Sequence, residues 1–324
     1  MIKVLILDEN DLGQRIGKNF SDEVKIPYKF SHFKDGEMFI ELEKSVKDID
    51  VILVSTISYP VNDNLVKTLI CCDTLRRSMA KSITLIVPYL GYSRQDRRTG
   101  PYQPITARLI ADVLQAAGVN RVITCDLHAR QIEGFYGVPI DNIPLMLILG
   151  NRWKQMVEAN NINVSDFVVV SPDHGGVTRA REFMGQAGID HLVIINKQRK
   201  KANEVDSMEV IGDVKNKNCI IIDDLVDTGG TLMRASKELK AAGAKKIYIY
   251  CTHGVLSADA IEKLSNCEEI ETLVITNTID KTKQLINDKI RSVDISDVIS
   301  DIIKSFDTSE NVYEYLGRVL GRTK

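Results

Sequence analysis

The chain has 324 residues, which is enough for about two domains of ordinary size. Its 44% hydrophobic and 27% charged residues are typical of a globular protein and exclude a disordered chain. The net charge of −2 argues against a protein that wraps duplex nucleic acid. The apolar runs are much shorter than the roughly 20 residues that span a bilayer, and no signal-peptide pattern opens the chain. We expect a cytoplasmic protein with no membrane or nucleic-acid partner.

The cysteines show neither a CxxC pair nor a His-rich spacing, and most lie in or beside apolar runs. They are Cys71, Cys72, Cys125, Cys219, Cys251 and Cys267. We interpret them as reduced, buried thiols rather than as disulfides or zinc ligands.

Short apolar runs typical of β-strands alternate with longer segments of helical periodicity. The expected strands are, in chain order, Lys3–Leu7, Val51–Ser55, Ile83–Val87, Arg121–Thr124, Phe167–Val170, His191–Ile195, Asn218–Ile222, Lys246–Cys251 and Thr272–Ile275. The clearest helix is Thr106–Ala117, which has one apolar face and stops before Gly118. This alternation predicts an α/β fold with mainly parallel sheets flanked by helices.

Two other segments add to this pattern. Short β segments near Tyr28–Phe33 and Met38–Glu41 flank a turn, and they predict a hairpin added to the first sheet. The charged tail from Lys281 ends in a helical pattern, and it can cross back to the first domain.

One internal repeat supports two similar domains. Thr106–His128 aligns without gaps to Thr231–His253, and each copy reads as a helix, an Ala-Ala-Gly stop, a basic turn, a strand and a His. We place the domain boundary near Leu145–Asn151, which gives domains of residues 1–146 and 147–324.

The strongest chemical signal is CIIIDDLVDTGGT, Cys219–Thr231. Here an apolar strand ends in two acids, and a loop then opens a helix. At the carboxyl end of a parallel strand, glycine N–H groups and a helix N-terminus can hold a monophosphate. Asp223 and Asp224 are placed to accept hydrogen bonds from sugar hydroxyls or to hold a Mg²⁺-bound group. The structural alternative is a buried strand followed by an ordinary helix cap.

This segment resembles the phosphoribosyl-diphosphate-binding motif of type I phosphoribosyltransferases. From Phe33 to about Asn277 the chain resembles one branch of that superfamily, the ribose-phosphate diphosphokinases, more closely still. The resemblance implies two type I phosphoribosyltransferase-like domains. It also implies transfer of the β,γ-diphosphoryl group of Mg-ATP to the anomeric hydroxyl of ribose 5-phosphate, which yields 5-phospho-α-D-ribose 1-diphosphate and AMP. Mg²⁺ is the implied cofactor, and self-association as a dimer or hexamer is implied by a shared ATP site.

Two motifs carry the implied ATP site. By itself FKDGE is an exposed turn with two acids, and RQDRR is a basic loop suited to phosphate. The resemblance implies that Phe33 offers a face to adenine and that the other positions contact the nucleotide. These other positions are Asp35, Glu37, Arg94, Gln95, Asp96 and Arg97.

The remaining site residues also follow from the resemblance. It assigns His128 and Asp173 to the metal, and it assigns Lys197 and Arg199, in the run Asn196–Ser207, to a flexible catalytic loop that stabilises transferring charge. It assigns the 5-phosphate to a loop whose members are Asp227, Thr228, Gly229, Gly230 and Thr231.

Three alternatives remain open. A phosphoribosyltransferase that consumes the sugar diphosphate would share the Cys219–Thr231 segment, although FKDGE, RQDRR and the duplicated domain favour the synthetase. A non-catalytic regulatory relative would keep the fold and lose catalytic positions, which are all present here. A nucleic-acid-binding protein is suggested only by the Arg cluster.

The sequence departs from the family pattern outside the catalytic motifs. A Ser-Val-Ser type segment near the C-terminus is replaced by Asn311-Val312-Tyr313, and Gln103 stands where the family often has Glu. The N-terminal segment also lacks the usual Ser-Gly-Asn type turn. Because the hydroxyl-rich segment belongs to the regulatory phosphate site of the family, we expect only weak activation by orthophosphate.

Overall fold

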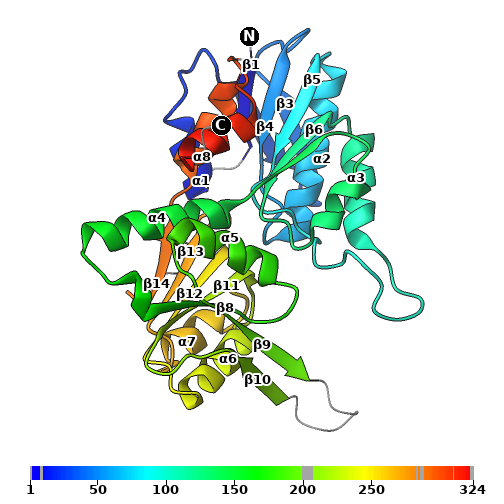
Figure 1. Cartoon of the computed structure of the whole chain (residues 1–324). Helices are drawn as coiled ribbons and strands as arrows, with labels where there is room; N and C mark the ends of the chain where they lie inside the picture. Colours follow the sequence, from blue (N-terminus) through cyan, green and yellow to red (C-terminus); the bar gives the residue numbers. More distant parts are fainter. Residues whose placement is uncertain are drawn as a thin grey trace. The chain divides into compact units, whose positions relative to one another are not determined.

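The computed structural model describes residues 2–7, 10–198, 207–281, 284, 288–308 and 310–321. The chain forms two compact units (Figure 1). Unit 1 comprises Met1–Ile143, Thr278–Asp280 and Asp294–Leu316, and unit 2 comprises Pro144–Asn277, Lys281–Val293 and Gly317–Lys324. The boundary between the units lies between Ile143 and Pro144, just before the expected boundary at residue 146. Part of the C-terminal tail belongs to unit 1. No helix in the described part of the chain has the length and apolar character needed to cross a membrane.

Unit 1 is built on a parallel sheet with the strand order β1-β4-β5-β6-β7. The strands are β1 (Ile2–Ile6), β4 (Asp50–Val54), β5 (Ser82–Ile86), β6 (Arg121–Cys125) and β7 (Ile140–Ile143). The helices are α1 (Asp11–Gly17), α2 (Val61–Arg77), α3 (Thr106–Ala116), the 3₁₀ helix η1 (Arg130–Phe135), α8 (Ser296–Ser305) and α9 (Val312–Val319), whose last residues belong to unit 2.

The two faces of this sheet are covered by different helices (Figure 1). On one face, buried side chains such as Leu53 and Leu85 pack with Leu75 of α2 and Leu114 of α3. On the other face, α1 and α8 lie together, and Asn19 Nδ2 donates to Ser300 Oγ at 2.9 Å. The C-terminal segment thus completes the unit that the N-terminus begins.

The expected hairpin forms, but it is not part of the first sheet. Strands β2 (Tyr28–His32) and β3 (Met38–Leu42) make a separate two-stranded antiparallel sheet. The outer edge of β1 is already occupied, because Val4 N donates to the carbonyl of Val24 and its own carbonyl accepts from Ile26 N. The hairpin instead packs against α2 through β3.

Unit 2 is built on a larger sheet with the order β10-β9-β8-β11-β12-β13-β14. All its neighbouring strands are parallel except the β9–β10 pair at one edge. The strands are β8 (Phe167–Ser171), β9 (Leu192–Gln198), β10 (Ser207–Ile211), β11 (Asn218–Val226), β12 (Lys246–Gly254), β13 (Thr272–Thr276) and β14 (Ile290–Val293). The helices are α4 (Leu145–Ala159), the 3₁₀ helix η2 (Val164–Asp166), α5 (Val177–Ala187), α6 (Gly230–Ala241) and α7 (Ala260–Ser265).

Alternating side chains of the central strands build two cores in unit 2. Ile220 and Ile222 of β11 pack with Trp153 of α4 and Phe183 of α5. Cys219 and Ile221 point the opposite way and join side chains of α6 and α7. Because both faces of the sheet are covered, its central strands are continuous apolar runs.

The expected strands and the helix at Thr106 are confirmed. Most of their ends shift by one residue, but β9, β11 and β12 end later than expected, at Gln198, Val226 and Gly254. Both copies of the internal repeat form a helix followed by a parallel strand, α3–β6 and α6–β12. All six cysteines are buried and free, as expected. Strands β7, β10 and β14 were not expected, and β9 and β10 include the ends of the segment expected to be a loop, Asn196–Ser207.

Candidate functional site

Two loops of unit 2 follow neighbouring strands at the point where the strand order of its sheet reverses. The chain runs outward from β8 to β9 on one side, and it continues from β11 on the other side of β8. The carboxyl ends of β8 and β11 therefore flank a topological switch point, which is where open α/β sheets bind ligands. The loop after β8 contains Asp173, and the loop after β11 contains Asp227–Thr231.

The loop after β8 is held by its own acid. Asp173 Oδ1 accepts from Gly176 N at 3.0 Å, and Ser171 Oγ donates to the Asp173 carbonyl at 2.7 Å. A Cβ on Gly176 would lie 3.0 Å from Ser171 Oγ, so the turn has little room for a side chain. This turn leads directly into α5.

Asp223 and Asp224 lie inside a strand, which corrects the expectation that the strand ends before them. β11 continues to Val226 because β12 runs beside it, with Asp223 opposite Cys251 and Val226 opposite Gly254. Strand alternation puts Asp224 on the same face as Ile222, which is the face that carries α5. Arg179 of α5 reaches both acids, with Nη1 3.3 Å from Asp224 Oδ1 and 3.8 Å from Asp223 Oδ1.

The surroundings of Asp223 disfavour its charged form. Burial and the Asp224 carboxylate raise the pKa of Asp223 well above its usual range, and the charge of Asp173 adds to the rise. Arg179 opposes it only in part. A ligand that brings hydroxyl donors or a cation to Asp223 would favour its ionised form.

The loop after β11 contains one glycine with no room for a side chain and one with open space beside it. Gly229 caps α6 with φ +77°, and a Cβ there would lie 2.9 Å from Leu264 Cγ. Gly230 has no such neighbour, since its Cβ would be 3.9 Å from Thr228 Oγ1. Thr228 and Thr231 are exposed beside these glycines. The loop thus presents backbone N–H groups and hydroxyls at a helix N-terminus, which suits a phosphate.

In unit 1 the segment between β5 and α3 contains Arg94, Arg97 and Arg98, and we call it the arginine loop. Hydrogen bonds and close packing hold its first half in place. A Cβ on Gly91 would lie 2.4 Å from the Ile57 carbonyl oxygen, so only glycine fits there. Gln95 receives the Thr106 hydroxyl on its side chain and the Ala107 N–H on its carbonyl, the latter at 3.1 Å. These contacts join the loop to the start of α3 and leave Arg94 exposed.

The loop after the neighbouring strand β6 contains His128. Asp126 is buried with φ +35°, and Leu127 N donates to Asn142 Oδ1 at 3.0 Å, while His128 is exposed. Gln131 Nε2 of η1 donates to Asp96 Oδ2 at 2.7 Å. The arginine loop and the His128 loop are therefore joined at the carboxyl edge of the sheet.

The hairpin turn is a separate feature of unit 1. Phe33 N donates to the Glu37 carbonyl at 2.8 Å, Glu37 N donates to Asp35 Oδ1 at 3.1 Å, and Gly36 has φ +95°. Phe33 is 56% exposed and lies edge-to-face with Phe39, with ring centroids 6.1 Å apart. Its ring is available for stacking.

The structure describes only part of the expected catalytic loop. Lys197 lies in β9 opposite Met208, and Arg199 lies outside the described residues. His174, which follows Asp173, is 3.2 Å from Asn196 Oδ1 through Nε2 and so contacts the strand that leads to Lys197.

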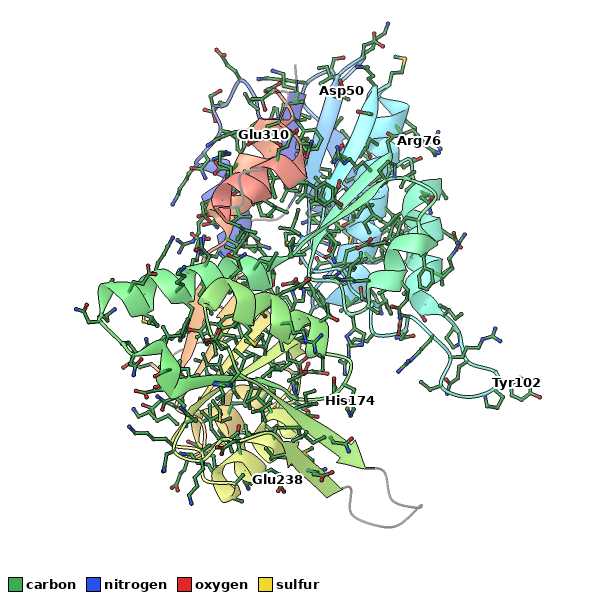
Figure 2. All side chains as sticks on the ribbon, in the orientation of Figure 1. Asp50, Arg76, Tyr102, His174, Glu238 and Glu310 are labelled. Atoms are coloured by element: carbon green, nitrogen blue, oxygen red, sulfur yellow. The ribbon has the colours of Figure 1, made fainter. Side chains whose placement is uncertain are left out.

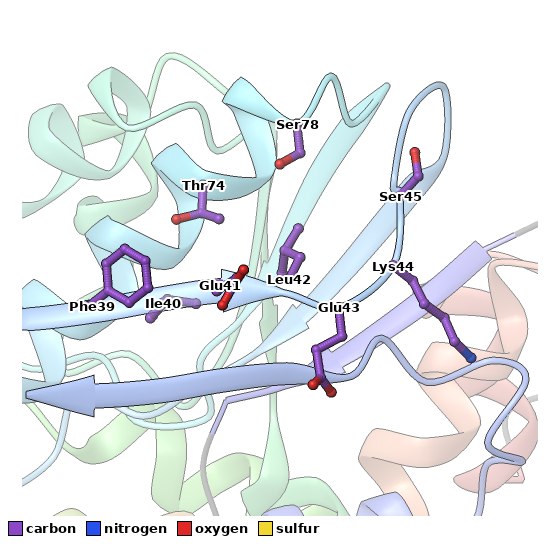
Figure 3. A pocket seen from close by; sticks show the side chains of 9 residues that line it. All are labelled: Phe39, Ile40, Glu41, Leu42, Glu43, Lys44, Ser45, Thr74 and Ser78. Carbon is purple, nitrogen blue, oxygen red and sulfur yellow. The ribbon is translucent and has the colours of Figure 1, made fainter.

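Within the described residues, no group of three or more His, Cys, Asp or Glu side chains has metal-binding geometry. A single carboxylate such as that of Asp173 nevertheless suits Mg²⁺, which takes one or two carboxylates together with substrate phosphates and waters. One cavity of about 540 Å³ lies between β3 and the end of α2 (Figure 3), and it contains none of the expected site residues. Its lining is Phe39, Ile40, Glu41, Leu42, Glu43, Lys44, Ser45, Thr74 and Ser78.

Comparison with known proteins decides the family. Residues 2–118 match the N-terminal domain of ribose phosphate pyrophosphokinase, and residues 169–318 match the phosphoribosyl synthetase-associated domain. A ribose-phosphate pyrophosphokinase of Clostridium tetani is 41% identical over 306 residues, which are 94% of this chain and 93% of that one. The chain belongs to the ribose-phosphate pyrophosphokinase family.

Other relatives of this family agree. The ribose-phosphate pyrophosphokinase of Campylobacter jejuni is 43% identical over 86% of this chain and 87% of its own. The crystal structure of phosphoribosylpyrophosphate synthetase from Mycobacterium smegmatis superposes with a TM-score of 0.86 and 32% identity, covering 95% of this chain and 99% of that one. The resemblance seen in the sequence is confirmed, and the chain is an enzyme of the family with the expected α/β fold.

Sequence reasoning singled out residues of this ribose-phosphate pyrophosphokinase family member that lie together, and it missed some of their partners. It placed Asp173 and the Asp223–Thr231 segment at strand ends, and the structure brings them to one edge of the sheet. It did not foresee that Arg179 forms ion pairs with the two acids or that Gln131 holds Asp96. For Arg179 a signal existed in its position just after Gly175-Gly176, whereas nothing local pointed to Gln131.

Proposed function

We propose that this enzyme transfers the β,γ-diphosphoryl group of Mg-ATP to the anomeric hydroxyl of ribose 5-phosphate, giving 5-phospho-α-D-ribose 1-diphosphate and AMP. Family membership supports the general activity. The observation that carries the sugar-phosphate half is the loop after β11, where Gly229 adopts a left-handed conformation and the uncrowded Gly230 begins α6 at the switch point.

The sugar phosphate would bind in unit 2. The loop from Asp227 to Thr231 would receive the 5-phosphate through backbone N–H groups and the hydroxyls of Thr228 and Thr231. Asp223, with Asp224 beside it, would accept hydrogen bonds from the ribose hydroxyls. Because the pKa of Asp223 is raised, hydroxyl donors would also favour its charged form.

The nucleotide would bind through unit 1. Phe33 would stack on adenine, with Asp35 and Glu37 as polar contacts. Arg94, Gln95 and Arg97 would contact the nucleotide, and Arg is suited to bidentate phosphate contacts. Asp96 would act at least partly by holding the loop, since its carboxylate receives Gln131.

Transfer of the diphosphoryl group mainly requires positioning and neutralisation of oxygen charge. His128 and Asp173 would hold Mg²⁺, which when bound supplies positive charge to the ATP phosphate oxygens. Lys197 and Arg199 would stabilise the charge that develops as the bond to AMP breaks. We also propose that the enzyme self-associates, as the shared ATP site implied by its family resemblance requires.

The test is phosphorus NMR of the purified protein with ATP, ribose 5-phosphate and Mg²⁺. We expect AMP and a ribose 1-diphosphate signal to appear together, without ADP. Appearance of ADP would contradict diphosphoryl transfer. If no turnover occurs, 5-phospho-α-D-ribose 1-diphosphate is added, and release of diphosphate from it that depends on an added nucleobase would identify a phosphoribosyltransferase instead.

A further inference from the structure

The arginine loop of unit 1 has a second half whose fold depends on one side chain. Residues 97–105 are almost all exposed, and Figure 2 shows Tyr102 at the tip of the projecting loop. The backbone of Tyr102 has φ +59°. Pro101 and Pro104 lack an N–H donor, so the stretch offers few backbone donors with which to stabilise itself.

Gln103 supplies the acceptor that closes this stretch. Its Oε1 accepts from Thr99 N at 2.9 Å, from Thr99 Oγ1 at 2.8 Å and from Gly100 N at 3.0 Å. Three donors from two adjacent residues therefore converge on one oxygen. The turn from Thr99 to Gln103 follows Arg97 and Arg98 directly, so it fixes the direction in which the chain leaves these arginines.

The other end of the arginine run is fixed independently. Asp96 is held by Gln131, and Gln95 is held by the start of α3. Arg97 and Arg98 thus lie between two anchored points, one at Asp96 and one at the Gln103 turn.

We propose that Gln103 is a positioning residue for nucleotide binding, because its side-chain oxygen holds the turn that orients Arg97 and Arg98. This inference rests on the proposed function, in which the arginine loop contacts ATP. Gln103 does not itself touch the substrate. Loss of its acceptor would leave the arginines charged but less well ordered, so a larger ordering cost would accompany ATP binding.

The test compares Gln103→Met, which keeps the length of the side chain but removes the acceptor, with Gln103→Glu, which keeps the acceptor. Hydrogen exchange of the peptide containing Thr99 and Gly100 reports the turn directly, because their N–H groups are the donors. We expect this peptide to exchange about tenfold faster in Gln103→Met, as local opening becomes easier, and to stay protected in Gln103→Glu.

Steady-state kinetics then test the positioning role. For Gln103→Met we expect the KM for ATP to rise about fivefold, the scale of one or two lost hydrogen bonds. The kcat and the KM for ribose 5-phosphate should stay near wild type, and Gln103→Glu should recover most of the loss. Tyr102→Asn is the matched control, since Asn tolerates positive φ and the Tyr102 ring is fully exposed.

The outcomes separate the inference from the function on which it rests. An active wild type whose Gln103→Met variant keeps the wild-type KM for ATP overturns the inference alone, as does unchanged exchange of Thr99 and Gly100. An equal rise in both KM values also overturns it, because that would indicate general damage. A wild type that produces no AMP overturns the proposed function, and the inference with it.

Discussion

At the scale of single residues, the adjacent glycines of the loop after β11, Gly229 and Gly230, are present for different reasons. Gly229 needs to be glycine because its φ is +77° and because Leu264 fills the space where a Cβ would lie. Gly230 has ordinary helical surroundings and open space above it. The sequence motif shows that both are glycine but cannot show this difference, because the crowding comes from α7, more than thirty residues further on.

We therefore expect opposite consequences for the two alanine variants. Gly229→Ala should lower the free energy of unfolding by about 2 kcal/mol, from left-handed backbone strain and the clash with Leu264. Gly230→Ala should leave stability near wild type but weaken binding of ribose 5-phosphate, because its methyl group would face the ligand. Urea unfolding and calorimetric titration with ribose 5-phosphate measure the two effects. Equal losses of stability in both variants would contradict the different roles that we expect for Gly229 and Gly230.

At the scale of elements, the sequence predicted strands best where apolar runs are long and worst for strands at the edges of the sheets. The central strands β4, β5, β8 and β11 were found because both their faces are buried. Strand β14 was missed because it is short and two of its four residues are exposed. The hairpin was found, but its attachment was not, since the edge of β1 is occupied by Val24–Ile26 rather than by a strand with a recognisable pattern.

The β9–β10 hairpin supports a prediction about catalysis. Lys197 pairs with Met208 and Gln198 pairs with Ser207, so Lys197 lies near the end of β9, next to the antiparallel edge strand β10. Lys197→Ala should lower kcat by at least about a hundredfold, the usual scale for a contact made in the transition state. Lys237→Ala, an exposed lysine on α6, is the control. An unchanged kcat in the Lys197 variant, measured as AMP production at saturating substrates, would remove Lys197 from the mechanism.

The start of α9 gives a physical reason to expect only weak activation by orthophosphate. Asn311 Oδ1 accepts from Tyr313 N and Glu314 N, both at 3.0 Å, while Glu314 Oε2 accepts from Asn311 N at 2.8 Å. Asn311 is thus used as a helix cap, and the exposed Tyr313 is bulky. Titration of orthophosphate at saturating Mg²⁺ should change activity by less than about fivefold, the low end of allosteric coupling. A steep activation curve would refute this.

At the scale of the whole molecule, buried neutral side chains limit stability at high pH. Burial raises the pKa of the Cys72 and Cys219 thiols to about 12, and that of the Tyr250 hydroxyl to about 12. In the unfolded chain a thiol ionises near pH 8.5. These groups therefore make their full contribution to the free energy of unfolding below that pH, and the contribution is lost as pH rises toward 12.

We expect the urea midpoint to fall steadily from pH 9 upward, beginning where the unfolded thiols ionise. A variant with Cys72→Ala and Cys219→Ala should show a shallower fall, because two of the ionising groups are gone. A thiol reagent should react with the native protein only on the timescale of unfolding. A midpoint independent of pH up to 10, or fast reaction of native thiols, would contradict the burial of these groups.

The return of Asp294–Leu316 to unit 1 has a consequence for how the protein is made. On the ribosome the sheet of unit 1 emerges first, yet α8, which packs with α1 on one of its faces, is among the last segments translated. Unit 1 must therefore wait with an apolar face uncovered while the whole sheet of unit 2 is synthesised. We therefore expect the newly made chain to expose an apolar surface for longer than a protein whose domains are continuous in sequence.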